Sequence, residues 1–181
     1  QAFVDQINAE AAARAMAGFA GVRRRFDLVG EAAGITVVDD YAHHPTEIAA
    51  TIGAASQLGF RHVHVLFQPH RYSRAPLFTE VLKDDFGRAF DAADAVTFMD
   101  VYPAGEAPVP GVSGKTFLNV VLDHAGHPEA AYVPRRVEVV PYLAAKAMEG
   151  DLVITMGAGD VTAIGPQLVD ALRGDAGVSA S

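Results

Sequence analysis

The sequence contains no cysteine, and this absence removes several kinds of chemistry at once. Disulfide bonds, thiol catalysis and thiolate zinc sites all require a cysteine sulfur, so the sequence excludes them. A chain without cysteine is compatible with the reducing cytoplasm, which is the compartment we expect. With 181 residues the chain fits one domain of ordinary size, large enough to bury a core without covalent cross-links.

Long apolar runs are also missing. No stretch approaches the roughly 20 consecutive apolar residues of a membrane helix, and the first residues lack the basic and apolar regions of a signal peptide. We therefore expect no membrane partner. The sequence does not begin with methionine and opens directly into a helical pattern over residues 5–18, from which we expect a piece of a longer protein.

Positive charge is outweighed by negative charge. The formal net charge is −8, which argues against a nucleic-acid partner, because nucleic-acid-binding proteins present a broad basic face. Basic residues cluster instead at Arg23–Arg25 and at Arg71 with Arg74. Local cationic clusters in an acidic protein suggest small anionic ligands, with exposed solubilising arginines as the alternative for both clusters.

Apolar strand patterns alternate with helical patterns along most of the chain. A short strand from Arg24 to Val29 precedes a turn at residues 31–34. The alternation predicts an α/β fold, a Rossmann-like, doubly wound, mostly parallel sheet with helices on both faces, formed by one domain over residues 1–181. A long Pro/Gly-rich loop is expected at residues 103–114 and a frayed tail at 174–181. The other strands are expected near residues 35–39, 62–67, 95–101, 131–133 and 152–156, and the helices near 45–57, 76–91, 115–124, 137–148 and 160–173.

The most informative motif is Asp-Asp-Tyr-Ala-His-His-Pro at residues 39–45, between an apolar strand pattern at residues 35–38 and a helix pattern. It places two acids, a phenol and two imidazoles at the carboxyl end of a strand, where open α/β sheets bind ligands. Pro45 suits the first helical position, and Glu47 suits the first turn. His44 would lie near the N-cap, where free amide groups could hold an anion.

Three more motifs follow strand patterns, and in a doubly wound sheet such strand ends converge on one crevice. Phe-Gln-Pro-His-Arg-Tyr-Ser-Arg at residues 67–74 places arginines before a helix, an unfavourable position that a bound carboxylate or phosphate would relieve. Asp-Val-Tyr-Pro-Ala-Gly-Glu at residues 100–106 contributes Asp100 and Glu106, which could contact an amine or a hydrated magnesium ion, with a turn cap as the alternative. Met-Gly-Ala-Gly-Asp at residues 156–160 provides glycines for close approach to a ligand and Asp160 as a helix cap, with a tight strand-to-helix turn as the alternative.

Two weaker patterns receive a structural interpretation. Residues 114–116 end like a phosphate-binding loop, but a valine stands where the full pattern requires glycine, so we reject that loop. His62 and His64 share one face of a strand, about 6 to 7 Å apart, which could suit metal ligation together with His43 or His70. No tight multi-ligand spacing accompanies them, so we favour structural or interface histidines and assign no metal ligand.

Taken in order, these motifs resemble the C-terminal domain of the Mur ligase family. The matching pieces span nearly the whole chain and are Arg25-Phe26, Asp-Asp-Tyr-Ala-His-His-Pro-Thr-Glu, Phe-Gln-Pro-His-Arg-Tyr-Ser-Arg, Asp-Val-Tyr-Pro-Ala-Gly-Glu and Met-Gly-Ala-Gly-Asp. The Asp-Tyr-Ala-His core is shared with folylpolyglutamate ligases, whereas the His-Arg-Tyr-Ser-Arg block favours the alanine-adding branch. The resemblance implies an ATP-dependent ligase of peptidoglycan precursor synthesis, which joins L-alanine to the carboxylate of UDP-N-acetylmuramate through an acyl phosphate.

The resemblance also implies roles for individual residues. The residues implied to contact the nucleotide are Arg25, Asp40 and Tyr41. Those implied to lie near the alanine carboxylate are His43, His70, Arg71 and Arg74. Those expected to support both groups are His44, Asp100, Tyr102, Glu106, Gly157, Gly159 and Asp160. ATP and Mg²⁺ would bind mainly to a central ATPase domain, which with an N-terminal UDP-binding domain would complete the longer protein. We expect no catalytic nucleophile in this domain and no activity from it alone.

Other interpretations stay open at this point. The chain could belong to another Mur or folylpolyglutamate-type ligase, which the identity of the amino-acid substrate would distinguish. It could instead be a non-catalytic nucleotide-binding module that uses the same strand-end crevice. A histidine-based metallohydrolase is a third possibility, which metal analysis would test.

Overall fold

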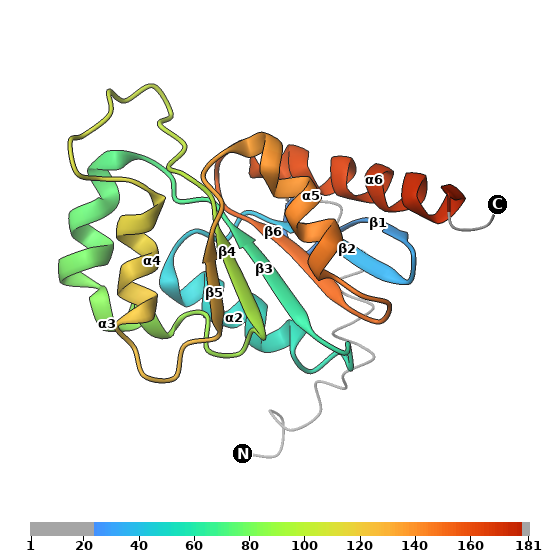
Figure 1. Ribbon diagram of the computed structural model, residues 1–181. Helices are drawn as coiled ribbons and strands as arrows, with labels where there is room; N and C mark the ends of the chain where they lie inside the picture. Colours follow the sequence, from blue (N-terminus) through green and yellow to red (C-terminus); the bar gives the residue numbers. More distant parts are fainter. Residues whose placement is uncertain (1–23, 179–181) are drawn as a thin grey trace, which may run out of the picture.

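The computed structural model describes residues 24–178, and the helix predicted over residues 5–18 lies outside the described residues. The strands of its sheet are β1 (Asp27–Ala32), β2 (Ile35–Asp40), β3 (Val63–Phe67), β4 (Ala95–Phe98), β5 (Glu129–Tyr132) and β6 (Leu152–Met156). They lie in the spatial order β1-β2-β6-β3-β4-β5, and every neighbouring pair is parallel except β1 with β2 (Figure 1). The predicted mostly parallel α/β fold is confirmed.

Helices cover both faces of this sheet. They are α2 (Pro45–Ala55), α3 (Lys83–Arg88), α4 (Gly114–Leu122), α5 (Arg136–Lys146) and α6 (Ile164–Val178), with the 3-10 turns η1 (Tyr72–Arg74) and η3 (Asp160–Ala163) and the π turn η2 (Leu77–Val81). On one face α2, α3 and α4 pack through a cluster rich in phenylalanine, which includes Phe67, Phe86 and Phe117. On the other face α5 and α6 pack through aliphatic side chains such as Leu143 and Leu168.

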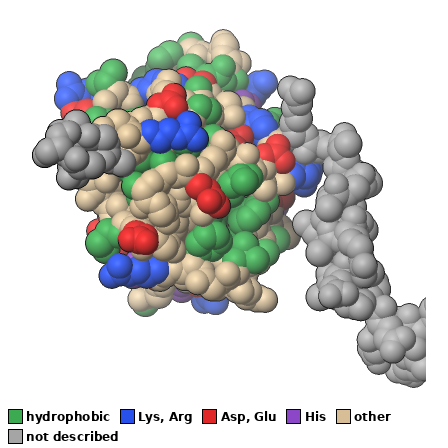
Figure 2. All heavy atoms as spheres, turned by 90° about the vertical axis from the view of Figure 1, so that its right-hand side faces the viewer, with side chains coloured by type: hydrophobic (Ala, Val, Ile, Leu, Met, Phe, Trp, Pro, Cys, Tyr) green, Lys and Arg blue, Asp and Glu red, His purple; other side chains and the backbone are tan. Residues whose placement is uncertain are grey.

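Burial explains why the central strands are continuous apolar runs in the sequence. Every residue of β3 and of β6 is buried, because helices cover both faces of a parallel sheet. The edge strand β1 is more exposed, and Leu28 on it is 64% exposed. On the side of the molecule where β1 and α6 lie, hydrophobic and acidic side chains are interspersed, and basic groups are scattered rather than gathered (Figure 2).

The strand order creates the edge that carries the candidate site. The chain passes from β2 through α2 to β3 and leaves a place between them, which β6 fills when the chain returns through α5. The carboxyl ends of β2, β6, β3 and β4 therefore lie side by side. We call the end of β2 and the loops that follow these four strands the carboxyl rim, which comprises residues 39–44, 157–160, 68–74 and 99–106. Open α/β sheets bind ligands at such a reversal of strand order.

The boundaries of β1, β4 and β5 differ from the prediction, and β5 runs from Glu129 to Tyr132 where residues 131–133 were expected. β1 begins at Asp27 rather than Arg24, because Arg24 and Phe26 adopt φ angles of 69° and 53°, which an extended strand does not allow. β4 ends at Phe98, so residues 99–101 of the predicted strand are not part of it, and an isolated bridge between His70 and Tyr102 follows. The central strands agree with the prediction to within one residue.

Two helical predictions are also corrected. The helix expected over residues 76–91 is divided into η2 and α3, because Leu82 between them has φ −109° and ψ 27°. The helix expected over residues 160–173 begins as the 3-10 turn η3, and α6 follows it from Ile164 to Val178. Within residues 24–178, no helix has the length and apolar character needed to span a bilayer.

Candidate functional site

Hydrogen bonds between loops hold the carboxyl rim together. The Gly157 amide donates to the Asp40 carbonyl oxygen over 3.1 Å, and the Arg71 amide donates to the Tyr102 carbonyl oxygen over 2.8 Å. The Tyr102 amide in turn donates to the Pro69 carbonyl oxygen over 2.8 Å. The structure therefore brings the four sequence motifs to one edge of the sheet, as expected from the topology.

Asp40 is buried beneath the first of these loops. Its two carboxylate oxygens accept hydrogen bonds from the amides of Phe26 over 2.8 Å and Ala42 over 2.7 Å. Burial raises the pKa of Asp40, and the two amide hydrogen bonds and the charge of Arg25 offset only part of that effect. The carboxylate fixes the loop and keeps lone pairs that can accept from a ligand hydroxyl.

Arg24 links two segments of the rim, residues 39–44 and 157–160. Its Nε donates to Asp39 over 2.8 Å, and its Nη2 donates to the Gly157 carbonyl oxygen over 2.6 Å. Its guanidinium carbon lies 5.2 Å from the centre of the Tyr41 ring. Arg24 is therefore a structural arginine, whereas the neighbouring Arg25 is exposed.

A cavity of about 670 Å³ opens beside the first loop and along α2. We call it the α2 pocket, and its lining residues are Arg25, Phe26, Asp40, Tyr41, Ala42, Thr46, Glu47, Ala50, Thr51, Ala54 and Leu58. It combines an apolar wall with a few polar groups at one end, which is the usual composition of a small-molecule site. The three residues that the sequence analysis assigned to a nucleotide, Arg25, Asp40 and Tyr41, all line it.

The helical wall of the α2 pocket was missed by the sequence analysis, which considered only the buried face of that helix. A usable signal was present in Ala50, Ala54 and Leu58, which repeat every four residues and so form a stripe along one side of the helix and its end. Leu58 is 58% exposed and contributes an apolar side chain to the end of this wall.

His43 and His70 lie together on the rim, each beside a tyrosine. Their ring centroids are 6.4 Å apart, Tyr41 lies 5.2 Å from His43, and Tyr102 stacks on His70 at 5.7 Å. Burial lowers the pKa of His70, and nearby arginines lower it further, so this imidazole is neutral at neutral pH. Among the described residues, nothing hydrogen-bonds its buried Nδ1.

Arg71 and Arg74 are held by the turn that follows β3. Arg71 has a φ of 70°, an uncommon value for a residue with a side chain, and Glu106 stabilises the turn by accepting from the Ser73 amide over 3.0 Å and hydroxyl over 2.6 Å. These hydrogen bonds lower the pKa of Glu106. Arg71 Nη1 lies 3.6 Å from Glu106 Oε1, whereas within residues 24–178 no carboxylate is at ion-pair distance from Arg74. The Arg74 guanidinium is therefore open to an anionic ligand.

Asp100 closes the loop beyond β4. Its Oδ1 accepts from the amides of Val101 over 2.9 Å and Gly114 over 2.8 Å. These bonds tie the start of the Pro/Gly-rich loop to the start of α4. Asp100 thus makes the turn-capping contacts that the sequence left open as the alternative.

The two glycines after β6 approach the protein itself. A Cβ at Gly157, where φ is 139°, would lie 2.7 Å from the Gln68 carbonyl oxygen, and a Cβ at Gly159 would lie 2.3 Å from Gln68 Oε1. The prediction of Asp160 as a helix cap is wrong, because Gly159 occupies the N-cap of η3. The Asp160 carboxylate instead accepts from Gln68 Nε2 and from Arg136, both over 2.8 Å. The tight strand-to-helix turn is the arrangement observed.

Replacing Gly159 with alanine is expected to lower the free energy of unfolding by about 1 to 3 kcal/mol, because the added methyl must displace Gln68 and Tyr102. Gly53→Ala is the matched control, since nothing lies within 4 Å of a Cβ there, and in the interior of α2 it should add about 0.5 to 1 kcal/mol. Urea unfolding of both variants measures the contrast. Equal stabilities would contradict the packing described for this turn.

His44 is the N-cap residue of α2, and the predicted helix start at Pro45 is confirmed. The amides of His43 and His44 both donate to Glu47 over 3.3 Å. Burial raises the pKa of Glu47, but the two amide hydrogen bonds outweigh it, so the pKa lies below its ordinary value. Glu47 therefore binds the two amides that directly precede this helix.

Comparison with known proteins identifies the family of the chain. The sequence profile described as "Mur ligase, glutamate ligase domain" matches residues 24–159, which is most of the chain and includes all four rim motifs up to Gly159. The chain belongs to the Mur ligase family. The resemblance read from the motifs is confirmed.

Relatives of this Mur ligase chain include the UDP-N-acetylmuramate–L-alanine ligase of Pelotomaculum thermopropionicum, which is 48% identical over 91% of the chain. The chain spans 34% of the length of that relative. Solved structures share the fold: the murein peptide ligase of Psychrobacter arcticus has a TM-score of 0.68 at 23% identity, covering 90% of this chain and 32% of its own. The UDP-N-acetylmuramate–alanine ligase of Thermotoga maritima has a TM-score of 0.63 at 24% identity, and the match covers 91% of this chain and 36% of the Thermotoga maritima chain.

Proposed function

We propose that this Mur ligase chain is the domain that contacts the amino acid and the nucleotide in an ATP-dependent ligase joining L-alanine to the carboxylate of UDP-N-acetylmuramate. The observation that carries the proposal is the 48% identity to a UDP-N-acetylmuramate–L-alanine ligase over nearly the whole chain. Because the chain spans about a third of that relative, we also propose that a central ATPase domain and an N-terminal UDP-binding domain complete the protein.

The proposed reaction has two steps. Transfer of the γ-phosphoryl group of ATP to the muramate carboxylate gives an acyl phosphate and ADP. The amine of L-alanine then attacks the acyl carbon, loses a proton and expels inorganic phosphate through a tetrahedral intermediate. Neither step requires a nucleophile from this chain, so its residues act through positioning and electrostatics.

The α2 pocket is the proposed nucleotide contact. Its apolar helical wall suits the face of a base, the Asp40 carboxylate can accept from two vicinal ribose hydroxyls, and the exposed Arg25 can approach phosphates. Tyr41, which is 42% exposed, adds an aromatic surface.

Mg²⁺ is proposed to bind mainly in the central domain. The described rim carboxylates fit a magnesium site poorly, because each is already engaged by amides, hydroxyls or an arginine. The hydrogen bonds concerned are those of Asp39, Asp40, Asp100, Glu106 and Asp160.

The alanine carboxylate is proposed to bind among His43, His70, Arg71 and Arg74. Three features support this: the open guanidinium of Arg74, the Arg71 side chain oriented by Glu106, and the unpartnered Nδ1 of a neutral His70. Guanidinium groups grip carboxylates through charge-assisted hydrogen bonds, each contributing about 1.5 to 3 kcal/mol.

The amino-acid dependence of ADP formation tests the proposed substrate. With the full-length protein, UDP-N-acetylmuramate and MgATP, we expect L-alanine to be used in preference to glycine, L-glutamate and murein tripeptide. Preference for the tripeptide would identify a murein peptide ligase, and preference for glutamate on a folate acceptor would identify a folylpolyglutamate-type ligase. ATP binding without any effect of an amino acid would indicate a non-catalytic module.

The isolated chain is expected to show no ATP hydrolysis above background, because we place the phosphate-binding groups and Mg²⁺ in another domain. The measurement compares ADP release by equal amounts of the purified 181-residue chain and the full-length protein. Magnesium-dependent turnover by the isolated chain that persists through repeated purification would refute this placement.

A further inference from the structure

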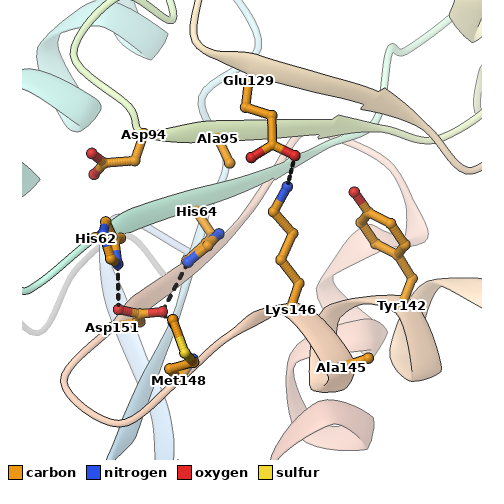
Figure 3. Close-up of a pocket in the computed structure, with 10 residues that line it drawn as sticks. All are labelled: His62, His64, Asp94, Ala95, Glu129, Tyr142, Ala145, Lys146, Met148 and Asp151. Atoms are coloured by element: carbon orange, nitrogen blue, oxygen red, sulfur yellow. Dashed lines mark hydrogen bonds and ion pairs between the residues drawn. The ribbon is translucent and has the colours of Figure 1, made fainter.

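A second cavity, of about 740 Å³, lies at the opposite end of the sheet from the carboxyl rim (Figure 3). It collects ionisable side chains at the amino ends of four strands: His62 precedes β3, Asp94 precedes β4, Glu129 begins β5 and Asp151 precedes β6. Lys146 reaches into it from the end of α5 and pairs with Glu129 over 2.6 Å. We call it the amino-end cavity. None of the proposed ligase contacts lines it.

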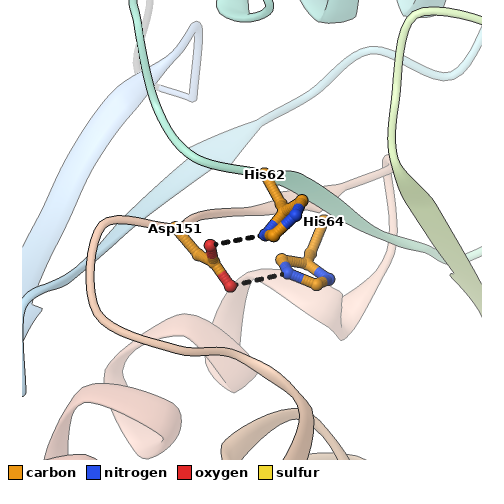
Figure 4. A group of neighbouring side chains, drawn as sticks. All are labelled: His62, His64 and Asp151. Atoms are coloured by element: carbon orange, nitrogen blue, oxygen red, sulfur yellow. Dashed lines mark hydrogen bonds and ion pairs between the residues drawn. The ribbon is translucent and has the colours of Figure 1, made fainter.

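Its wall contains a triad of His62, His64 and Asp151 (Figure 4). His62 Nδ1 lies 3.0 Å from one oxygen of Asp151, and His64 Nε2 lies 3.0 Å from the other. The two histidines share a strand face, and the parallel pairing of Val63 with Leu152 places Asp151 beside them. Asp151 is 87 residues away from His64 in the sequence, so the spacing of residues in the sequence did not indicate it as a partner of the histidines.

The triad is partly buried and rigidly built. The Asp151 side chain is fully buried, His64 is 10% exposed and His62 is 38% exposed. The Met148 amide also donates to Asp151 over 2.9 Å, which fixes the carboxylate in the turn between α5 and β6. Burial raises the pKa of Asp151, but the hydrogen bonds from Met148, His64 and His62 outweigh it, so the group is a carboxylate at neutral pH.

We propose that His62, His64 and Asp151 form a binding site for one divalent transition-metal ion of the Zn²⁺ class. Two imidazoles and one carboxylate suit zinc, cobalt or nickel, whereas magnesium and calcium prefer sites made of oxygen. Three protein ligands leave a coordination position for water on the side of the amino-end cavity. The sequence also allowed a metal site shared by His62 and His64 with His43 or His70. That shared site is excluded, because the length of β3 separates His62 and His64 from His43 and His70 by about 20 Å.

The ligand atoms are already close to the spacing that an ion requires. Zinc binds nitrogen and oxygen at about 2.0 to 2.2 Å, which puts neighbouring ligand atoms about 3.3 Å apart. The two histidine-to-carboxylate distances are 3.0 Å, and all the ligand atoms lie within 4.8 Å of one another. The partly exposed His62 can turn to bring its nitrogen toward that of His64. Each neutral imidazole carries its proton on the other ring nitrogen when the ion is bound.

The site has a structural consequence. His62 and His64 belong to the start of β3, and Asp151 belongs to the turn that leads into β6, so a bound ion ties together two central strands whose connection passes through β4 and β5. An ion that binds only the folded chain raises the free energy of unfolding. Once the metal concentration exceeds the dissociation constant, this increase grows with the logarithm of the metal concentration.

The test uses the 181-residue chain made without a histidine tag, stripped with EDTA and titrated with Zn²⁺ alone. We expect one equivalent to bind by calorimetry, a rise in Tm on saturation, and a visible absorption band when Co²⁺ replaces Zn²⁺. His62→Ala should weaken zinc binding by at least about 100-fold while preserving the far-UV circular dichroism, because this side chain is only partly buried.

Two histidine variants serve as controls. His124→Ala breaks a single histidine–carboxylate pair, His124 with Asp91 at 3.1 Å, and should leave zinc binding unchanged. His43→Ala removes a rim histidine and should also leave it unchanged. The proposal is overturned if the wild-type chain binds no stoichiometric zinc, if His62→Ala binds it as tightly as wild type, or if His43→Ala abolishes binding.

Discussion

Replacing Arg74 with alanine in the full-length ligase is expected to raise the KM for L-alanine by about 10- to 100-fold, the effect of losing one charge-assisted hydrogen bond to a carboxylate. Among the described residues, Arg74 has no carboxylate partner, so its removal should leave no buried charge unpaired and should cost little stability. Steady-state kinetics with varied L-alanine at saturating ATP and UDP-N-acetylmuramate measure the change. The KM for ATP should remain within about twofold.

Two further variants sharpen this test. Arg71→Ala should act in the same direction on the alanine KM, and its pairing with Glu106 predicts an added loss of order in the turn. Arg61→Ala is the control, because Arg61 is an exposed arginine at the amino end of β3, away from the rim. Wild-type alanine kinetics in both Arg71→Ala and Arg74→Ala would remove the carboxylate assignment.

Filling the α2 pocket should weaken the use of ATP rather than that of L-alanine. Ala50→Trp places an indole in the wall of the pocket and is expected to raise the KM for ATP by at least tenfold, with the KM for L-alanine nearly unchanged. Ala50 is exposed, so the larger side chain requires no rearrangement of the core. Kinetics with varied ATP, supported by an unchanged melting temperature, provide the measurement.

The neighbouring residue supplies a matched control for this substitution. Ala49 is exposed on the same helix but does not line the pocket, so Ala49→Trp should leave both KM values at the wild-type level. If the two tryptophan variants behaved alike, whether both impaired or both normal, the α2 pocket would not be the nucleotide contact.

Local chemistry in the sequence was sufficient to predict most of the fold. The apolar runs of β2, β3 and β6 are buried on both faces, so each central strand is marked by composition alone. Pro45 and Glu47 mark the start of α2, and the helix begins there. The alternation of strands and helices predicts parallel strands joined by crossovers. In that topology the four loops converge on one edge of the sheet.

Contacts between distant residues and local backbone exceptions could not be predicted. The left-handed φ angles of Arg24 and Phe26 delay the start of β1, although neither residue type favours that conformation. The lack of a side chain at Gly159 was interpreted as space for a ligand. That space is occupied by Gln68, which lies 91 positions earlier in the sequence. Asp151 gave no metal signal, because its histidine partners lie on another strand.

The central claim is that L-alanine and the nucleotide meet this chain along the same rim, at separate contacts. A crystal structure of the full-length ligase with a non-hydrolysable ATP analogue and L-alanine tests it most directly. We expect the alanine carboxylate within hydrogen-bond distance of Arg71 or Arg74 and the nucleoside against Asp40 and the α2 pocket. An alanine carboxylate held entirely by another domain, or a nucleoside bound away from α2, would contradict it.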